Sequence, residues 1–310
     1  MEEITEGCLA GPFSAQQLNE KFGKHWLPAR RFPVVQGIKI RPVDDFSQFG
    51  VNAAFGTAEK ISMLGVDQVV GWAKAWCEST SDDRSVSLLD SAGQRYSGWL
   101  HEDWELDDWR HLLGRVADLK NAYKQLPRHP AHAVLSIIAV PDPHTLDIAF
   151  FEAYSLMFGE AAAVYAFLRF SRALSALACS LFRTVAVEFF DDFSQIEPKV
   201  TSNSAQRTLE SLFDLLGWKV SMGEDKRKVF EHSFVSLGVL VDYSNLHAGE
   251  VLLKNKPGRI EGIKDQLKLL VDKGLLRSRD ALSLRGKIYF AEGQIFGRIA
   301  APIVHSLSRW

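Results

Sequence analysis

Three aspartates carry the clearest chemical signal in this sequence: Asp118 and the adjacent pair Asp191 and Asp192. Phosphoryl transfer from a nucleoside triphosphate develops negative charge, which two magnesium ions about 3.5–4 Å apart neutralise by clamping the attacking and leaving oxygens. Such hard cations prefer carboxylate ligands. Adjacent aspartates within the apolar sequence FFDDF, at 189–193, repel each other unless a cation compensates their charge. These residues therefore indicate a two-metal site for phosphoryl transfer.

An aspartate pair alone is a weak signal, because the same dipeptide occurs elsewhere in the chain. The other pairs are Asp44-Asp45, Asp82-Asp83 and Asp107-Asp108. For these three, a solvated loop is the better interpretation. The histidines of RHPAH, at 128–132, lack a Cys or acidic partner at metal-ligand spacing, and HEDWELDDW, at 101–109, predicts an exposed acidic surface. The context of each pair must therefore decide.

The segments around the three aspartates predict the elements that must position them. Residues 184–196 alternate apolar and small side chains on both sides of the acidic pair, which predicts a β-hairpin with the pair at its turn. The segments 115–123 and 132–140 have the alternation and the β-branched residues of two strands. Helical spacing of apolar residues predicts a long buried helix over 155–182 and an amphipathic helix over 203–217.

The remaining segments predict a mixed α+β chain that ends in helices. Residues 52–117 are rich in Trp and acidic residues and predict loops around short strands, as in an elaborated insertion. The segments 228–242 and 247–254 predict a short antiparallel pair. The last fifty-odd residues predict helices that are separated by Gly274 and Gly293.

Composition places the chain among ordinary globular proteins. It has 310 residues, of which 46% are hydrophobic and 24% are charged, enough to bury a substantial core. The cysteines Cys8, Cys77 and Cys179 form no CxxC pair, so neither a disulfide framework nor a zinc site is indicated. The N-terminal sequence has no secretory pattern, and the apolar stretch 146–190 is interrupted by charges. We expect an intracellular protein, cytoplasmic or nuclear, with no membrane partner.

The charges are unevenly distributed along the chain. The formal net charge is -2, but residues 251–310 contain 12 Lys and Arg against 5 Asp and Glu, a local charge of +7. The remainder therefore has 24 basic and 33 acidic residues, a charge of -9. A basic terminal segment can supply a phosphate-binding surface even on a slightly acidic protein. A solvated helical face explains the same charges equally well.

The aspartates and their surroundings resemble the successive motifs of reverse transcriptases. The resemblance covers residues 38–242 and includes a fingers-like motif, three palm-like motifs, a lysine motif and a primer-grip turn. These segments are IKIRPVDDFSQFGVN (38–52), DLKNAY (118–123), FGEAAAVYAF (158–167), FFDDF (189–193), LGWKVSMGEDK (216–226) and FVSLGVLVD (234–242). The segment 283–298 resembles the helical thumb and connection of retroelement polymerases, in particular the tyrosine-recombinase retrotransposon group.

The resemblance implies a metal site built on the three aspartates. Asp118 and Asp191 would ligate two Mg²⁺ ions, for which Mn²⁺ can substitute. Asp192 would lie beside them, and the carbonyl group of Leu119 would be an additional ligand.

It also implies roles in binding and turning over the incoming nucleotide. Tyr123 would act as a sugar gate, because an aromatic ring packed under the ribose collides with a 2′-hydroxyl group and so favours DNA synthesis. Arg41 and Lys39 would hold the triphosphate. Lys226 would be the general acid for the leaving pyrophosphate, with Lys228 as the alternative.

Four further residues match the family's nucleotide-binding motifs. Asp45 and Phe46 fall in the fingers-like motif. Gly159 would allow close approach of the backbone to the template–nucleotide pair, and Phe158 would pack beneath it. Three positions depart from the family's pattern, namely Ala162, Val164 and Phe189.

The implied fold is α+β with right-hand polymerase architecture, in which helices back an antiparallel palm sheet. Residues 1–117 would form an N-terminal extension and fingers with an insertion, 118–242 the palm with finger elements near 124–150, and 243–310 a helical thumb or connection. The implied enzyme is an RNA-directed DNA polymerase, a nucleotidyltransferase that uses an RNA template, a DNA or RNA primer and dNTPs. RNase H and integrase or recombinase functions would come from other chains or regions.

Two alternatives remain open from the sequence. One is a catalytically degenerate retroelement remnant that binds nucleic acid without extending a primer. The other is an RNA-dependent RNA polymerase, because the carboxylate arrangement is shared between these classes. Tyr123 argues against the second.

Overall fold

The computed structural model describes residues 2–36, 39–142, 144–223 and 227–293, together with 295, 302, 305 and 306. Over these residues the chain forms α-helices and four β-sheets, which confirms the predicted α+β class. The chain divides into two compact units, each assembled from three separate segments. Unit 1 comprises Met1–Ser62, Leu119–Ala176 and Phe213–Val220, and unit 2 comprises Met63–Asp118, Leu177–Leu212 and Ser221–Trp310.

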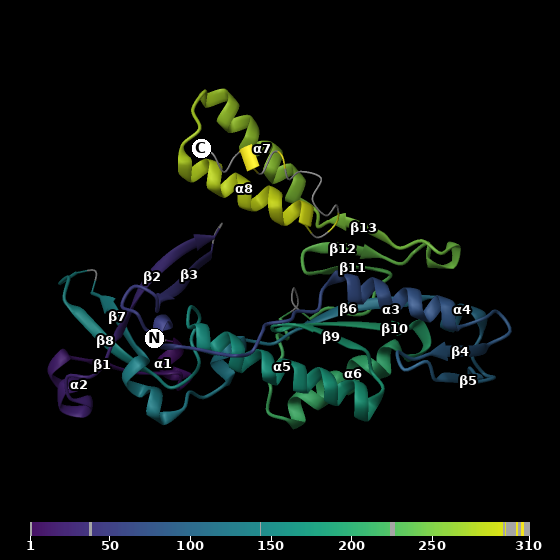
Figure 1. Cartoon of the computed structure of the whole chain (residues 1–310), viewed down its shortest axis with the longest axis horizontal. Helices are drawn as coiled ribbons and strands as arrows, with labels where there is room; N and C mark the ends of the chain where they lie inside the picture. Colours follow the sequence, from purple (N-terminus) through teal and green to yellow (C-terminus); the bar gives the residue numbers. More distant parts are fainter. Residues whose placement is uncertain are drawn as a thin grey trace. The chain divides into compact units, whose positions relative to one another are not determined.

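A five-stranded sheet in the order β1-β8-β7-β2-β3 forms the centre of unit 1 (Figure 1). Its neighbouring strands are antiparallel except for β2 and β7, which are parallel. Apolar side chains of this sheet and its connections, among them Phe46 and Ile138, pack into one core. The strands are β1 (Leu9–Phe13), β2 (Pro28–Gln36), β3 (Lys39–Asp45), β7 (Ile137–Pro141) and β8 (Ile148–Ala153).

Short helices precede or follow the strands of unit 1. In α2 the Ser14 side chain accepts a hydrogen bond from the Gln17 N–H, and the Gln17 side chain accepts one from Ser14 in return. This capping box explains why the helix starts there. The elements are α1 (Glu2–Thr5), α2 (Ala15–Phe22), and the 3₁₀ helices η1 (Asn52–Ala54), η2 (Ala122–Gln125) and η3 (Pro130–Leu135).

Helix α5 confirms the predicted long helix, over Ala161–Phe182 rather than from 155. Its buried residues recur at helical spacing along one face, which leaves the other face exposed. They are Ala163, Phe167, Leu168, Ser171, Leu174, Ser175 and Ala178. By length and composition alone α5 could cross a membrane, a property that buried core helices share.

Three sheets belong to unit 2. The first has the order β6-β10-β9, the second β11-β12-β13, and the third is the hairpin β4-β5 (Figure 1). Leu112 and Val187 of the first sheet share a core with Val239 and Val241 of the second. The strands are β4 (Ser85–Leu89), β5 (Arg95–Trp99), β6 (Leu112–Asp118), β9 (Ala186–Phe189), β10 (Asp192–Pro198), β11 (Ser233–Ser236), β12 (Val239–Asp242) and β13 (Leu252–Asn255).

Helix α3 (Val66–Ser79) corrects the prediction that 52–117 consists of loops around short strands. Val66, Val69 and Ala73 lie on one face of α3 and are buried in the same core as the two sheets. The Tyr243 hydroxyl also donates a hydrogen bond of 3.1 Å to the Val69 carbonyl. The partly buried Val70, Trp76 and Cys77 pack against the same core, so the apolar residues of α3 recur at helical spacing, and burial of this face stabilises the helix.

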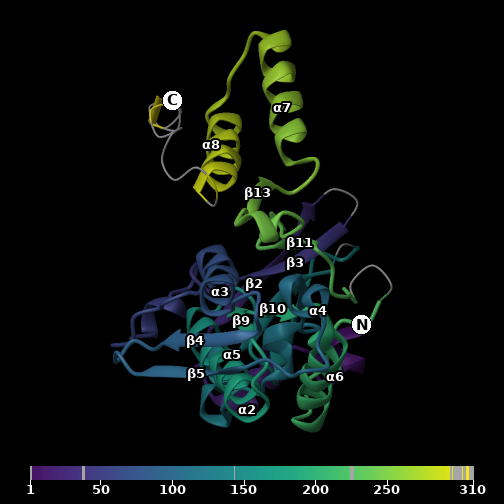
Figure 2. The ribbon, with the colours of Figure 1, turned by 90° about the vertical axis from the view of Figure 1, so that its right-hand side faces the viewer.

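Helices α6, α7 and α8 are close to their predicted positions, whereas the short helices α4 and η4 were not predicted. Helix α6 begins four residues before the predicted start, and Gly274, in the left-handed conformation, ends α7 as expected. Helices α7 and α8 lie side by side (Figure 2). These elements are α4 (Leu106–Arg110), α6 (Lys199–Leu215), η4 (Leu246–Ala248), α7 (Arg259–Lys273) and α8 (Ser278–Gly293).

The strands near the C-terminus form a three-stranded sheet rather than the predicted antiparallel pair. β11 and β12 make a hairpin within 228–242, and β13 pairs with β12. Leu237 and Gly238, which join β11 to β12, have φ of 51° and 75°. Positive φ at both central residues is typical of a type I′ turn, which gives a tight hairpin that sequence alternation alone does not reveal. The division into fingers, palm and thumb at residues 117 and 242 stays a prediction.

Candidate active site

Two of the three predicted aspartates face each other across adjacent strands of unit 2. Asp118 is the last residue of β6 and Asp192 the first residue of β10, and the two are direct antiparallel partners. The ladder continues without a register shift to Pro198 and Leu112. Directly opposed residues have Cβ atoms about 4.5–5.5 Å apart and project from the same face of a sheet. Both aspartates are half-buried.

The third aspartate lies in the turn that precedes Asp192. Phe189 pairs with Asp192, so Phe190 and Asp191 form a two-residue connection between β9 and β10. This confirms the predicted hairpin with its turn at the acidic pair. Phe190 has φ of 55°, a conformation that residues other than glycine seldom adopt. Its ring lies edge-on to that of Phe189, with centroids 5.3 Å apart.

Asp118 is also held from its other side. The Ser221 N–H donates a hydrogen bond of 2.8 Å to the Asp118 carbonyl oxygen, and Ser221 is buried. Leu119, the predicted carbonyl ligand, is buried and forms an isolated β-bridge with Val220. The backbone that presents the first aspartate is therefore fixed by hydrogen bonds to two neighbouring segments.

A buried arginine lies behind the aspartates in the same ladder. Arg115 is only 2% exposed and is the direct partner of Gln195 in β10. Its guanidinium group donates hydrogen bonds to Gln195 Oε1 at 2.7 Å, Glu210 Oε1 at 2.9 Å and the Lys228 carbonyl at 3.2 Å. It also lies over the Phe230 ring, 5.5 Å from the centroid. Arg115 thus joins β6, β10, α6 and the segment at 228–230.

The charges around Arg115 have shifted pKa values. Burial lowers the pKa of Arg115, although the Glu210 carboxylate opposes that shift. Burial would raise the pKa of Glu210, but hydrogen bonds from Arg227, Gln206 and Arg115 outweigh it and hold this pKa below its usual value. Sequence reasoning missed this network. The only local signal was an arginine within a strand pattern, and its partners come from distant segments.

We predict that Arg115→Ala lowers the free energy of unfolding by about 3–5 kcal/mol, because it leaves the buried groups that it contacts without their cation. Urea denaturation followed by circular dichroism measures the change. Arg227→Ala is the matched control, since Arg227 pairs with the same Glu210 at 2.9 Å but has a side chain that is 47% exposed. The control should lose less than about 1 kcal/mol. Equal losses would refute the role assigned to Arg115.

In unit 1, the predicted sugar gate Tyr123 packs against aromatic side chains. Tyr123 lies in η2 and is 8% exposed. Its ring centroid is 4.8 Å from that of Phe158, which was also predicted to bind nucleotide, and 4.9 Å from that of Phe167. The Phe158 ring is about half-exposed. The Tyr123 ring is therefore fixed between two others, as a rigid wall requires.

Gly159 packs against the end of β3. Its φ is 94°, and a Cβ atom at this position would overlap the Asp44 carbonyl oxygen. The Asn52 side chain donates to the Gly159 carbonyl at 2.9 Å and accepts from the Ala161 N–H at 2.8 Å. Asp45 accepts hydrogen bonds from two following amides and so shapes the turn after β3. Only glycine fits at 159, and Asn52, to which no role was assigned from the sequence, holds the Gly159–Ala161 segment through these two hydrogen bonds.

We predict that Gly159→Ala destabilises the fold by about 2–5 kcal/mol, about 1–2 from the left-handed backbone and about 1–3 from the overlap with Asp44. Thermal and urea unfolding measure this loss. Gly93→Ala is the control, because Gly93 has φ of 82° but nothing within 4 Å of its added Cβ. A loss at Gly159 no larger than that at Gly93 would contradict the steric part of the argument.

The prediction of a solvated loop for Asp44 and Asp45 is wrong for Asp44. Asp44 is 3% exposed and is the direct partner of Arg31 in the β2–β3 ladder. The Arg31 guanidinium donates two hydrogen bonds to its carboxylate, at 2.7 and 2.9 Å. Burial would lower the pKa of Arg31, but Asp44 and Glu3 outweigh it and raise this pKa. The cross-strand arginine compensates the buried charge.

The predicted basic residues are described to different extents. Arg41 is exposed on β3 and pairs through its backbone with Val34. Lys39 is the first residue of β3, but its side chain lies outside the described part of the structure. Lys226, the predicted general acid, also lies outside the described residues, whereas Lys228 is exposed.

The donor chemistry of the three aspartates fits magnesium. Among the described residues, no three His, Cys, Asp or Glu side chains are grouped as they would be around a metal ion. Magnesium, however, is usually bound by one or two carboxylates, with water and substrate phosphates completing its shell. Asp118 and Asp192 are opposed in the ladder, and Asp191 lies in the adjoining turn. Three carboxylates are therefore presented on an ordered backbone, which is enough for sites that use one or two carboxylates each.

Comparison with known proteins supports the fold alone. No family model and no curated protein matches the chain. Among solved structures, it is similar to the foamy viral protease-reverse transcriptase dRH in complex with double-stranded DNA, with a TM-score of 0.61 and 12% sequence identity. The match covers 99% of this chain and 42% of that one, so the chain spans less than half of the viral protein. The fold is therefore reverse-transcriptase-like.

Proposed function

We propose that the chain is an RNA-directed DNA polymerase that extends a primer 3′-hydroxyl group with dNTPs. The observation that carries this proposal is the antiparallel register that sets Asp118 opposite Asp192 and places Asp191 in the adjoining turn. Asp118 and Asp191 are the proposed ligands of two Mg²⁺ ions, with Asp192 and the Leu119 carbonyl beside them. When bound, these ions would activate the attacking hydroxyl group and neutralise the leaving pyrophosphate.

The remaining roles concern the nucleotide and its phosphates. Tyr123, held between Phe158 and Phe167, is proposed to exclude the 2′-hydroxyl group of a ribonucleotide. Arg41 and Lys39 are proposed to hold the triphosphate, because cations at these oxygens lower the charge of the transition state. Lys226 is proposed to protonate the leaving pyrophosphate.

Two more residues are proposed to shape the nucleotide site through the backbone. Gly159 would allow the template–nucleotide pair to approach the chain closely, above Phe158. Asp45 would orient the turn after β3, because its carboxylate accepts from the amides of Ser47 and Gln48.

The proposed partners are an RNA template and a DNA or RNA primer. The structurally similar viral protein is in complex with double-stranded DNA, which supports binding of a nucleic-acid duplex by this fold. RNase H and integrase or recombinase steps would be supplied by other chains or regions. A retrotransposon polymerase of this kind would act inside the cell, in the cytoplasm or the nucleus.

Primer extension with each combination of template and nucleotide tests the reaction class. We expect the fastest incorporation on an RNA template with dNTPs. A preference for ribonucleotides would favour the RNA-dependent RNA polymerase instead and would contradict the assignment to DNA synthesis.

The second candidate function is that of a nucleic-acid-binding remnant without activity. The observation that favours it is the departure from the family's pattern at Ala162, Val164 and Phe189. Such a remnant would bind a primer–template duplex with an affinity that falls with salt, yet would add no nucleotide. Binding and extension measured on one preparation separate the two candidates.

A further inference from the structure

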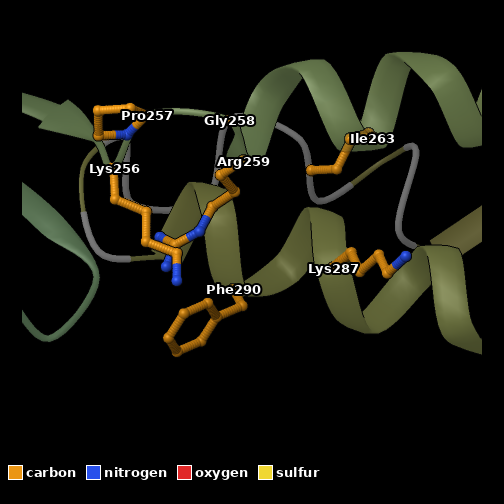
Figure 3. Close-up of a pocket in the computed structure, with 8 residues that line it drawn as sticks. Lys256, Pro257, Gly258, Arg259, Ile263, Lys287 and Phe290 are labelled. Atoms are coloured by element: carbon orange, nitrogen blue, oxygen red, sulfur yellow. The ribbon is translucent and has the colours of Figure 1, made fainter. Parts of the chain in front are cut away.

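A cationic pocket lies in unit 2 where β13 meets α7 and α8, on elements other than those that carry the aspartates (Figure 3). Its volume is about 360 Å³, and its lining includes Lys256, Arg259 and Lys287. No carboxylate is among the described residues that line it. A pocket of this volume is in the size range of small-ligand sites, and three cations with no carboxylate among the described lining residues favour an anion.

The connection between β13 and α7 forms one wall of the pocket. The Lys256 N–H donates to the Gly238 carbonyl at 3.1 Å, which fastens this connection to the β11–β12 turn. Gly258, with φ of 78°, then starts α7 without a side-chain cap. The side chains of Lys256 and Arg259 converge from this wall above the ring of Phe290, and Lys287 extends from α8 (Figure 3). The start of α7 adds to the positive potential that the three side chains create.

Arg259 is held in place by uncharged groups. Its guanidinium lies 4.6 Å from the Phe290 ring centroid and donates to Asn255 Oδ1 at 3.1 Å. It also passes so close to Gly238 that a Cβ atom there would overlap it. In the described part of the chain, no carboxylate forms an ion pair with Arg259. A guanidinium that is ordered by neutral contacts keeps its full charge for a ligand.

The charges indicate which phosphate the pocket would take. A phosphodiester within a strand carries one negative charge, whereas a phosphomonoester carries about 1.5–2 at neutral pH and offers three oxygens. Lys256 and Arg259, whose charged groups lie together in the open pocket, match the second group better, and Lys287, which donates to Gln266 Oε1 at 2.6 Å, adds to the positive potential. We propose that this pocket binds the terminal phosphomonoester of a nucleic-acid strand. The proposal rests on the proposed function, which supplies the strand.

Fluorescence anisotropy on the full chain tests this proposal, without Mg²⁺ or nucleotides so that catalysis plays no part. The probes are one oligonucleotide with a 5′-phosphate and the same oligonucleotide with a 5′-hydroxyl. We expect about tenfold tighter binding of the phosphorylated strand. Millimolar inorganic phosphate should remove this preference, because it competes for the pocket. Equal affinities, or a preference that inorganic phosphate leaves intact, would overturn the proposal.

Substitutions assign the preference to the pocket. Lys256→Gln and Arg259→Gln should each bring the two affinities close together. Lys256 has an exposed side chain, so its variant should fold even if Arg259→Gln is impaired. Lys268→Gln is the matched control, because it removes the same charge from α7 outside the pocket. A control that loses the preference as fully as Lys256→Gln would show a general charge effect and refute the site.

The phosphate-binding test and the primer-extension test can fail independently of each other. A chain that extends primers but ignores the terminal phosphate refutes the pocket alone. A chain that prefers the terminal phosphate but adds no nucleotide refutes the polymerase alone.

Discussion

Asp118→Asn should lower the rate of nucleotide incorporation by about a thousandfold or more. Asn keeps the size of the side chain and the β6–β10 ladder but removes the charge that is proposed to hold the metal ions. A thousandfold loss corresponds to about 4 kcal/mol of transition-state stabilisation, within the several kcal/mol that a metal ion supplies to phosphoryl transfer. Single-turnover primer extension at saturating Mg²⁺ measures the rate. Asp191→Asn should match this loss, and Asp192→Asn should lose less.

Asp103→Asn is the control for the charge change, because the Asp103 side chain is 83% exposed and is not one of the three proposed metal-binding aspartates. This variant should keep the wild-type rate. A rate for Asp118→Asn within tenfold of wild type, in a protein with unchanged unfolding, would show that Asp118 binds no catalytic metal.

Tyr123→Val should reduce the preference for deoxyribonucleotides over ribonucleotides by about 10–200-fold. The ring is buried and fixed by Phe158 and Phe167, so it cannot move aside for a 2′-hydroxyl group. Discrimination by one steric contact is typically worth about 1–3 kcal/mol, which gives this range. The measurement is the ratio of kcat/KM for dTTP and UTP on a poly-A template.

Two control variants test whether the change in nucleotide selectivity comes from the aromatic ring at position 123. Tyr123→Phe retains the ring and should retain the selectivity. Tyr154→Ala removes a half-exposed tyrosine, one that lies against Arg128, and should leave selectivity unchanged. If Tyr123→Val discriminates as well as wild type, the sugar-gate role is wrong.

Local patterns predicted the elements that carry the aspartates. Alternation around FFDDF was sufficient to predict the β9–β10 hairpin, because a two-residue connection constrains both strands at once. The α5 and α6 helices followed from apolar spacing and end signals. What the sequence did not provide was the register: that Asp118 faces Asp192 depends on pairing between strands over 70 residues apart.

Helix α3 could have been predicted, because its apolar residues between Val66 and Cys77 recur at helical spacing in the sequence, but the many Trp and acidic residues of 52–117 obscured this pattern. The other failures share a physical cause, namely stabilisation by contacts with other segments. Asp44 was placed in a solvated loop because its compensating cation, Arg31, lies on a neighbouring strand. The Arg115 network was missed for the same reason, since Glu210 and Lys228 are about a hundred residues away in the chain.

The central claim is that the chain catalyses templated DNA synthesis at the three aspartates. The most direct test is incorporation of dTTP on poly-A primed with oligo-dT, with Mg²⁺, for the wild-type chain beside Asp191→Ala. We predict primer extension by the wild type that stops on removal of Mg²⁺ with EDTA, and no extension by the variant. Absence of incorporation by a folded wild-type chain that binds the primer–template, or equal incorporation by Asp191→Ala, would contradict it.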